Sequence, residues 1–227
     1  LNTESSQHRK LTMRITQKTY NLLRSIKMRW DARKFSGWER IDGFLTPLEA
    51  VALFNYASAL PLGATVCEIG SYKGKSTVCL GRGLVISGGK KLIAIDPFDA
   101  SGDPESAMRY AEGRGDTPLL DQFLKNVENM GVRDIIEIKK GKAKEFAEAI
   151  QSVDLLFIDG DHSIGGCLED YEMYGNKVKA GGYLMFHDYD PNRKDLGPTY
   201  VIETKVYPSL EWAFVEKYGT LWVGKRV

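Results

Sequence analysis

Two apolar segments of the chain are each followed at once by side chains that can bind a cation or move a proton: Asp159, Asp161 and His162 after residues 154–158, and His187 and Asp188 after residues 182–186. Carboxylate oxygens are the ligands that hard divalent cations prefer. Imidazole titrates near neutral pH, so it can accept the proton of a hydroxyl group. These residue types therefore predict a metal site, a general base, or both.

The metal prediction depends on the two segments being neighbouring strands. Adjacent strands lie about 4.8 Å apart, so Asp159 and Asp188 would stand close together at the strand ends. Two carboxylates at that spacing repel each other unless a proton or a cation lies between them. A divalent ion, magnesium or manganese, would remove the repulsion and activate an acceptor oxygen. We expect Asp159, His187 and Asp188 as ligands, although His187 can equally stand beside the site without binding the ion.

Asp161 and His162 are the candidate general bases. The alternative is that they only cap a helix that begins near Ser163, where aspartate and serine are common. The two roles are compatible, so both stay open at this point.

A glycine-bearing turn follows an earlier apolar segment, residues 64–69, and reads Glu68-Ile69-Gly70-Ser71-Tyr72-Lys73-Gly74-Lys75-Ser76. Glycine permits a tight turn and a close backbone approach by a ligand, and the next helix offers free N–H groups to an anion. A Walker A loop would need glycine at position 69, and a dinucleotide fingerprint would need it at position 72. The chain has Ile69 and Tyr72 there, which leaves an ExGxxxG pattern, with or without a ligand.

A further acid, Asp96, ends the apolar segment 91–95. An acid at the end of the second strand, roughly 20 or more residues beyond the glycine turn, can bind ribose hydroxyls through two hydrogen bonds. Carboxylates thus follow three apolar segments. In open α/β sheets, ligands bind at this edge.

Strands and helices must alternate to bring these residues together. Strands are predicted by short apolar segments at 64–69, 91–95, 134–138, 154–158 and 182–186, with a hairpin at 211–217 and 220–226. Helices are expected at 46–59, 74–84, 117–130, 143–151 and 164–178. The pattern predicts an α/β fold with a doubly wound, Rossmann-like sheet, mostly parallel with a C-terminal antiparallel hairpin.

On these motifs the chain resembles the class I methyltransferases that depend on S-adenosylmethionine (SAM). It is most similar to metal-dependent small-molecule O-methyltransferases of the catechol and caffeoyl-CoA type and their antibiotic-sugar relatives. The resemblance covers about residues 44–226 and is carried by the glycine turn, Ile95-Asp96, and the stretches 157–162 and 181–189. It implies an enzyme that methylates a hydroxyl of a small-molecule acceptor. Tyr189 stands where the catechol-type enzymes carry asparagine, so the metal site departs from theirs.

The resemblance also implies a cofactor site. The glycine turn would line the methionine part of SAM, Asp96 would hold the ribose, and Lys142 and Ala143 would flank the adenine. Glu68 would order the turn. The expected cofactor residues are Glu68, Gly70, Ser71, Tyr72, Gly74, Ser76, Asp96, Lys142, Ala143 and Asp159.

Composition limits the class of protein. With 43% hydrophobic and 27% charged residues, the chain has the composition of a typical globular protein. No apolar run approaches the roughly 20 residues that span a bilayer, and the N-terminus does not read as a secretory leader. Three separated cysteines without a CxxC pair favour a reducing, cytoplasmic setting.

The charge is uneven along the chain. Residues 1–40 contain ten basic and three acidic residues, a net charge of +7, which leaves −6 for the rest of a chain of net charge +1. We expect a basic N-terminal extension at 1–43 and a methyltransferase domain at 44–227. The extension could bind nucleic acid or anionic lipid, or be a solvated helix that docks on a partner. No nucleic-acid-binding signature is present, so a nucleic-acid partner is not expected. We expect a homo-oligomer that does not bind a membrane.

A protein that keeps this fold only as a binding module, and docks through the basic extension, is the alternative to an enzyme. Such a module would not need acids at Asp159, Asp161 and Asp188 together. Their presence favours catalysis.

Overall fold

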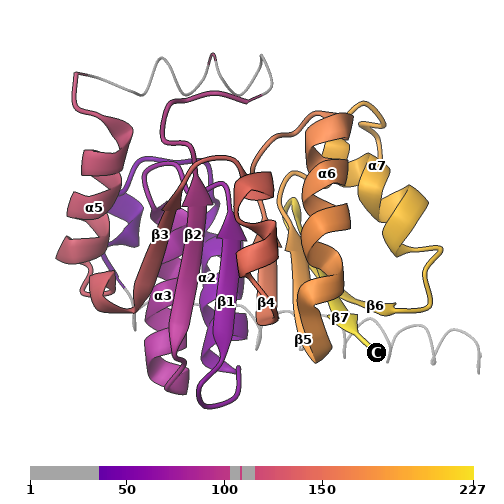
Figure 1. Ribbon diagram of the computed structural model, residues 1–227, viewed down its shortest axis with the longest axis horizontal. Coiled ribbons are helices and arrows are strands. Elements are labelled where there is room, and N and C mark those ends of the chain that lie inside the picture. The colour runs from indigo at the N-terminus through magenta and orange to yellow at the C-terminus, as the bar shows by residue number, and fades with distance from the viewer. Residues whose placement is uncertain (1–35, 103–107, 109–115) are drawn as a thin grey trace, which may run out of the picture. The chain divides into compact units, whose positions relative to one another are not determined.

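Seven short segments form the central sheet of the protein, in the order β3-β2-β1-β4-β5-β7-β6. The structure is a computed structural model that describes residues 36–102, 108 and 116–227. The strands are β1 (Thr65–Ile69), β2 (Lys91–Asp96), β3 (Ile136–Lys140), β4 (Val153–Ile158), β5 (Val178–Phe186), β6 (Trp212–Tyr218) and β7 (Leu221–Arg226). Strands β1 to β5 are parallel, and β7 runs antiparallel to both β5 and β6 (Figure 1). The predicted fold class is confirmed.

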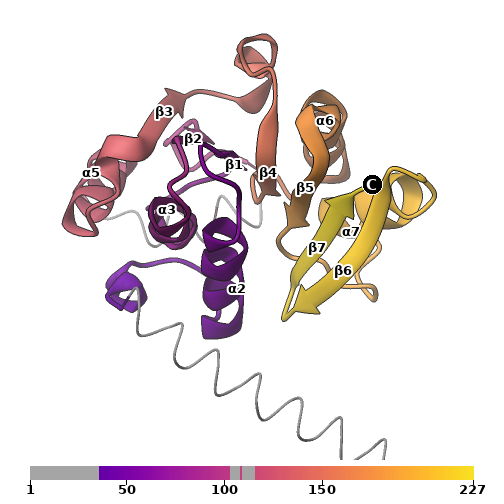
Figure 2. The same cartoon turned by 90° about the horizontal axis from the view of Figure 1, so that it is seen from below.

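Helices cover both faces of the sheet, as Figure 2 shows for the compact unit Gly37–Val227. Helices α2 (Pro47–Ser58) and α3 (Lys75–Ser87) pack on one face, and α6 (Ile164–Tyr174) lies on the other. Strand β4 is buried along its whole length, because side chains on both of its faces meet helices. Helix α5 (Leu119–Asn129) and the short helix α7 (Gly197–Val201) flank the two sides.

Two of the predicted helix starts are confirmed by their capping contacts. The Thr46 hydroxyl accepts a hydrogen bond from the Glu49 N–H, and the Glu49 carboxylate accepts one from the Thr46 N–H, which is a complete capping box with Pro47 at the first helical position. Ser163 caps α6 by accepting from the Gly166 N–H. Thr46 and Ser163 both line the cavity at the carboxyl ends of the strands, so both helices begin there.

Two other expectations were wrong in detail. The helix predicted at 143–151 is two separate 3₁₀ turns, Ala143–Glu145 and Ala147–Ala149. Only the first and the eighth of its residues, Ala143 and Ile150, are buried, so a continuous helix would have no apolar face to pack. The strand predicted at 134–138 begins later, after a 3₁₀ turn at Arg133–Ile135.

The helices near the C-terminal half of the sheet also differ from expectation. The helix predicted to reach residue 178 ends at Tyr174, where a 3₁₀ turn leads into β5. Helix α7 and the π-helical segment Ile202–Val206 were not predicted, because their residues follow no clear apolar period.

The segment Gly37–Gly43 packs against the domain. Trp38 is 3% exposed, the Lys75 ammonium donates to the Gly43 carbonyl (3.1 Å), and Lys73 pairs with Asp42 (2.7 Å). The domain boundary at residues 43 and 44 stays a prediction, and residues 1–35 of the basic extension lie outside the described residues. Within the described part of the chain, no helix is long and apolar enough to cross a membrane.

Candidate active site

A cavity of about 900 Å³ opens at the carboxyl ends of β1, β2, β4 and β5. It is lined by twelve of the residues that the sequence singled out: Gly70, Ser71, Tyr72, Ser76, Asp96, Lys142, Ala143, Asp159, Asp161, His162, His187 and Asp188. The structure thus brings the predicted cofactor, metal and base residues to one place. The two that do not line it are Glu68 and Gly74.

Glu68 and Gly74 are buried behind the glycine turn, outside the cavity, and help to fix its conformation. The buried Glu68 carboxylate accepts hydrogen bonds from the hydroxyls of Ser71 (2.9 Å) and Thr77, and its burial raises its pKa to about 7. Gly74 is in the left-handed region with φ 87°, and a Cβ there would lie 3.0 Å from the Phe123 ring. The contacts of Glu68 match an ordering role for this residue.

Gly70 lets the turn after β1 meet the turn after β4. Its φ is 88°, and a Cβ at this position would lie 2.1 Å from the carbonyl oxygen of Asp159. The Asp159 N–H donates to the Ile69 carbonyl at 2.8 Å. The first turn and the acid of the fourth strand are therefore fixed against each other by the backbone.

Asp96 holds the glycine turn as well as lining the cavity. Its Oδ2 accepts hydrogen bonds from the N–H groups of Ser71 and Tyr72 (2.8 Å each), and its Oδ1 accepts one from Phe98 (2.6 Å). Burial raises the pKa of this carboxyl, although the three N–H groups oppose the rise. A carboxylate has about four acceptor positions, so one remains for a further donor.

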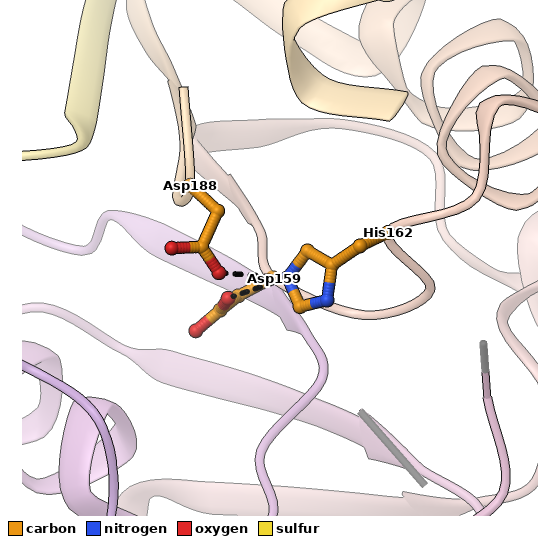
Figure 3. A group of neighbouring side chains, drawn as sticks. All are labelled: Asp159, His162 and Asp188. Atoms are coloured by element: carbon orange, nitrogen blue, oxygen red, sulfur yellow. Dashed lines mark ion pairs between the residues drawn. The ribbon is translucent and has the colours of Figure 1, made fainter. Parts of the chain in front are cut away.

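The candidate cation site consists of Asp159, His162 and Asp188, each of which offers one ligand atom within 4.8 Å of the others (Figure 3). His162 Nε2 lies 3.5 Å from Asp159 Oδ1 and 3.2 Å from Asp188 Oδ2. Asp188 has φ 56°, in the left-handed region, which aspartate adopts more readily than most non-glycine residues. The imidazole of this group is thus His162, which the sequence assigned as a base.

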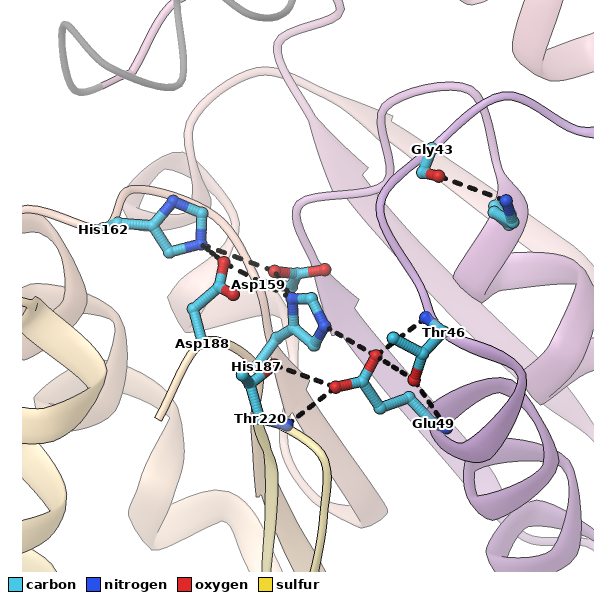
Figure 4. A network of polar contacts seen from close by, with 9 residues as sticks. Gly43, Thr46, Glu49, Asp159, His162, His187, Asp188 and Thr220 are labelled. Atoms are coloured by element: carbon cyan, nitrogen blue, oxygen red, sulfur yellow. Dashed lines mark hydrogen bonds and ion pairs between the residues drawn. The ribbon is translucent and has the colours of Figure 1, made fainter. Parts of the chain in front are cut away.

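His187 lies behind this group and is 4% exposed (Figure 4). Its Nδ1 lies 3.1 Å from Asp159 Oδ1 and 3.5 Å from Asp188 Oδ2, while its Nε2 lies 3.5 Å from Glu49 Oε2. Its ring therefore connects the acids of the cation site to helix α2.

Glu49 is a site residue that sequence reasoning missed. Its carboxylate is 1% exposed and accepts hydrogen bonds from the N–H and hydroxyl of Thr46 and from the N–H and hydroxyl of Thr220, in the β6–β7 turn. The spacing Thr46-x-x-Glu49 is a capping-box signal. It explains the glutamate at this position but does not show that the same carboxylate reaches His187.

The charges of this cluster depend on one another. Burial disfavours the charged imidazole, but hydrogen bonds and attraction from Asp159 and Asp188 raise the pKa of His162 to about 10. The two histidines hold the pKa of Asp188 well below its usual range, against the effect of its burial. A histidine with so high a pKa holds its proton at neutral pH, so it can act as a base only when another cation takes over the charge of the carboxylates.

The remaining predicted residues, Asp161, Lys142 and Ala143, also line the cavity. Asp161 Oδ1 accepts a hydrogen bond from the Ser163 N–H (2.8 Å), so it supports the start of α6. The Lys142 N–H donates to Glu145 (2.7 Å), and the Ala143 carbonyl accepts from the Tyr174 hydroxyl (2.6 Å). Asp161 thus combines the capping contact with a place at the cavity.

A family described as a methyltransferase domain matches residues 67–189, which is more than half of the chain. The chain belongs to this family. The match begins in β1 and ends just after Asp188, so it includes the glycine turn, Asp96 and the candidate cation site.

A curated relative of this methyltransferase is the uncharacterized protein R132 of Acanthamoeba polyphaga mimivirus. The two are 30% identical in an alignment 137 positions long, which covers 57% of this chain and 53% of the relative. The match thus spans about half of the relative's length.

Several solved structures share the fold. Cofactor-bound Rv0187 from MTB superposes with a TM-score of 0.60 at 15% identity, over 86% of this chain and 88% of that one. The O-methyltransferase TomG from Streptomyces achromogenes, in complex with SAM, gives 0.58 at 15% identity over 88% of each chain. An O-methyltransferase from Bacillus cereus, in complex with S-adenosylhomocysteine (SAH), gives 0.57 at 16% identity over 88% and 90%.

Proposed function

We propose that this methyltransferase transfers the methyl group of SAM to a hydroxyl of a small-molecule acceptor, with the help of a divalent cation. The observation that carries the proposal is the shared cavity. One wall is the glycine turn with Asp96, and the other holds the cluster of Asp159, His162 and Asp188. The named O-methyltransferases that share the fold, one with SAM and one with SAH, support the reaction class.

The cofactor contacts follow from the turn. Gly70 and its neighbours present backbone to the cavity, and the start of α3 offers N–H groups to the methionine carboxylate near Ser76. The remaining acceptor position of Asp96 suits a ribose hydroxyl. Lys142 and Ala143 would flank the adenine ring of SAM.

The donor atoms fit a cation of the proposed kind. Two carboxylates and one imidazole suit manganese, or magnesium with a less usual nitrogen ligand. A cation there would bind the acceptor oxygen and lower the pKa of its hydroxyl group. Asp159 and Asp188 would hold the ion, His162 would complete the ligands, and His187 would orient Asp159 from behind.

The methyl transfer itself needs alignment and removal of one proton. The acceptor oxygen forms a bond to the methyl carbon while the carbon–sulfur bond breaks, and the electron pair of that bond stays on sulfur. The hydroxyl proton leaves to a base. Asp161 and His162 both line the cavity, so Asp161 is the proposed base where His162 binds the cation, and His162 is the proposed base where it stays outside the ligands.

The cofactor proposal is tested by calorimetry with SAH, ATP and NAD. We expect SAH alone to bind. Binding of ATP or NAD without SAH would contradict the proposal and favour another nucleotide-binding class.

The metal proposal is tested by turnover of an acceptor panel of catechols and hydroxylated sugars with and without EDTA. Asp188→Asn should lower turnover about 10- to 100-fold, because the amide is a weaker ligand, and should leave SAH affinity nearly unchanged. Asp195→Asn, at the same cavity but paired with Arg193, is the matched control. Full turnover in excess EDTA would rule out the cation.

A further inference from the structure

Helix α6 carries an acid that the proposed reaction does not use. Asp170 is 8% exposed and lines the cavity. It lies between Cys167 and Tyr174 on the inner face of the helix, and both of these neighbours are fully buried. Among the described residues, the structure gives its carboxylate no hydrogen bond and no ion pair. A buried carboxylate without a donor is costly, so its place at a cavity wall points to a ligand that supplies one.

The position of Asp170 within the cavity is defined by two contacts. A Cβ on Gly160 would lie 3.4 Å from Asp170 Oδ2, so the carboxylate lies against the turn after β4. One helical turn further along α6, the Tyr174 hydroxyl donates to the carbonyl of Ala143, in the turn after β3. Asp170 therefore faces the space between these two turns.

Other acids near this space already have partners. Asp161 accepts the Ser163 N–H, Glu145 accepts the Lys142 N–H, and Glu169 lies 3.7 Å from the Lys144 ammonium. The Lys142 side chain offers donors but no acceptor. Asp170 is therefore the acid in this part of the cavity best placed to accept a hydrogen bond from a ligand.

The space between the two turns is where the proposed function places the adenine of SAM. The edge of adenine presents an amine donor beside a ring nitrogen acceptor, N1. We propose that Asp170 recognises this edge by accepting a hydrogen bond from the exocyclic amine. The inference rests on the proposed function, because it needs SAM in the cavity.

The electrostatics of Asp170 suit this pairing. Burial, together with the negative charges of Glu169 and Asp161, raises its pKa to about 7. Near neutral pH the carboxyl group is thus present both with and without its proton. The protonated form can donate to N1 while its other oxygen accepts from the amine, so both forms make at least one good hydrogen bond.

The test is calorimetry with SAH and with S-inosylhomocysteine, in which an oxo group replaces the amine. The wild-type protein should bind SAH about tenfold or more tightly, since a site that pairs with a donor rejects a ligand that lacks it. Asp170→Asn should remove or reverse this preference, because its amide can donate to the oxo group. Glu172→Gln, an acid on the same helix that does not line the cavity, should change neither affinity.

The outcomes separate the two proposals. A wild-type protein that binds neither ligand contradicts the proposed function and the inference together. If the wild type binds both ligands equally, or if Asp170→Asn keeps the full preference for SAH, the inference alone is overturned. The wild-type comparison requires no variant, so it decides even if Asp170→Asn does not fold.

Discussion

The carboxyl and amino ends of the parallel strands differ in how their backbone is held. All four non-glycine residues with positive φ in the described parts of the chain follow strand ends on the cavity side: Tyr72, Phe98, Ala100 and Asp188. Near the amino ends, positive φ is found at glycines: an added Cβ would meet nothing within 4 Å at Gly63, Gly131 and Gly181, and would meet the end of the Leu62 side chain at Gly88. Strain is thus kept on the cavity side, where packing enforces it, and the opposite turns follow local residue preference.

Buried charge shows the same contrast. Near the amino ends, Asp154 accepts from the Thr65 N–H (2.8 Å) and pairs with a half-exposed Lys179 (2.9 Å). At the carboxyl ends, acids gather around His162 and His187, and Asp170 has no partner among the described residues. At the amino end the buried charge is therefore stabilised by partners within the protein, while the cavity end holds charges whose best partners are ligands.

The largest expected effect is that of Gly70→Ala. Its Cβ would meet a carbonyl oxygen at 2.1 Å in a left-handed conformation, so we expect a loss of about 3 kcal/mol or more in the free energy of unfolding. Gly181→Ala is the control, because it has a similar φ of 78° with open space around it and should lose only about 1–2 kcal/mol. Urea denaturation measures both. Equal losses would remove the contrast between the two ends.

Glu49→Gln should have the next largest effect. The neutral amide weakens the hydrogen bonds from Thr46 and Thr220, which we expect to lower the free energy of unfolding by about 1–3 kcal/mol. Because Glu49 also orients His187, turnover should fall about tenfold, with little change in SAH affinity. Glu128→Gln, exposed on α5, is the control. An unchanged turnover would limit Glu49 to a purely structural role.

Asp170→Asn should change the pH dependence of stability in the absence of SAM. The pKa of Asp170 is about 7 in the folded state against an ordinary value of 3.8, so the folded state binds more protons between these values and the wild type loses stability as pH rises through this window. The variant has no such loss. Its free energy of unfolding relative to wild type, measured by urea denaturation, should therefore be higher at pH 8 than at pH 5 by about 1–3 kcal/mol. The same difference at both pH values would show that Asp170 does not titrate in this window.

The smallest expected effect is that of Asp154→Asn at the amino end. The amide oxygen can still accept the Thr65 N–H, and the lost ion pair involves a Lys179 side chain that is 48% exposed. We expect a loss of about 1 kcal/mol or less, and less at high salt. Thermal melts at two salt concentrations measure it. A loss as large as that of Glu49→Gln would show that buried charge matters equally at both ends.

The sequence predicted the strands and the acids that follow them, because an apolar segment and the residue after it are local features. Asp159 and Asp188 were placed together from strand adjacency alone, and the structure has β4 beside β5. The roles of His162 and His187 could not be predicted from the residues around them in the sequence. Which imidazole enters the group with Asp159 and Asp188 depends on the path of the turn after β4 and on the left-handed backbone at Asp188.

Glu49 and Asp170 show two different reasons for missing a residue. The partners of Glu49, Thr220 in the β6–β7 turn and His187, lie far away in sequence, so no pattern near residue 49 predicts these contacts. Asp170 had a usable signal. It lies three residues after Cys167 and four before Tyr174, which places an acid on the inner face of an amphipathic helix.

The hydrogen bonds from Thr220 to Glu49 join residues 171 positions apart. As a ribosome makes the chain, α2 emerges early, but the carboxylate of Glu49 must wait for the β6–β7 turn before these bonds can form. Contacts between such distant segments close large loops and form late in folding. The acids and histidines next to Glu49 therefore reach their final arrangement only after the β6–β7 turn has been synthesised, so we expect a chain that lacks this turn to lose the order of the cation site.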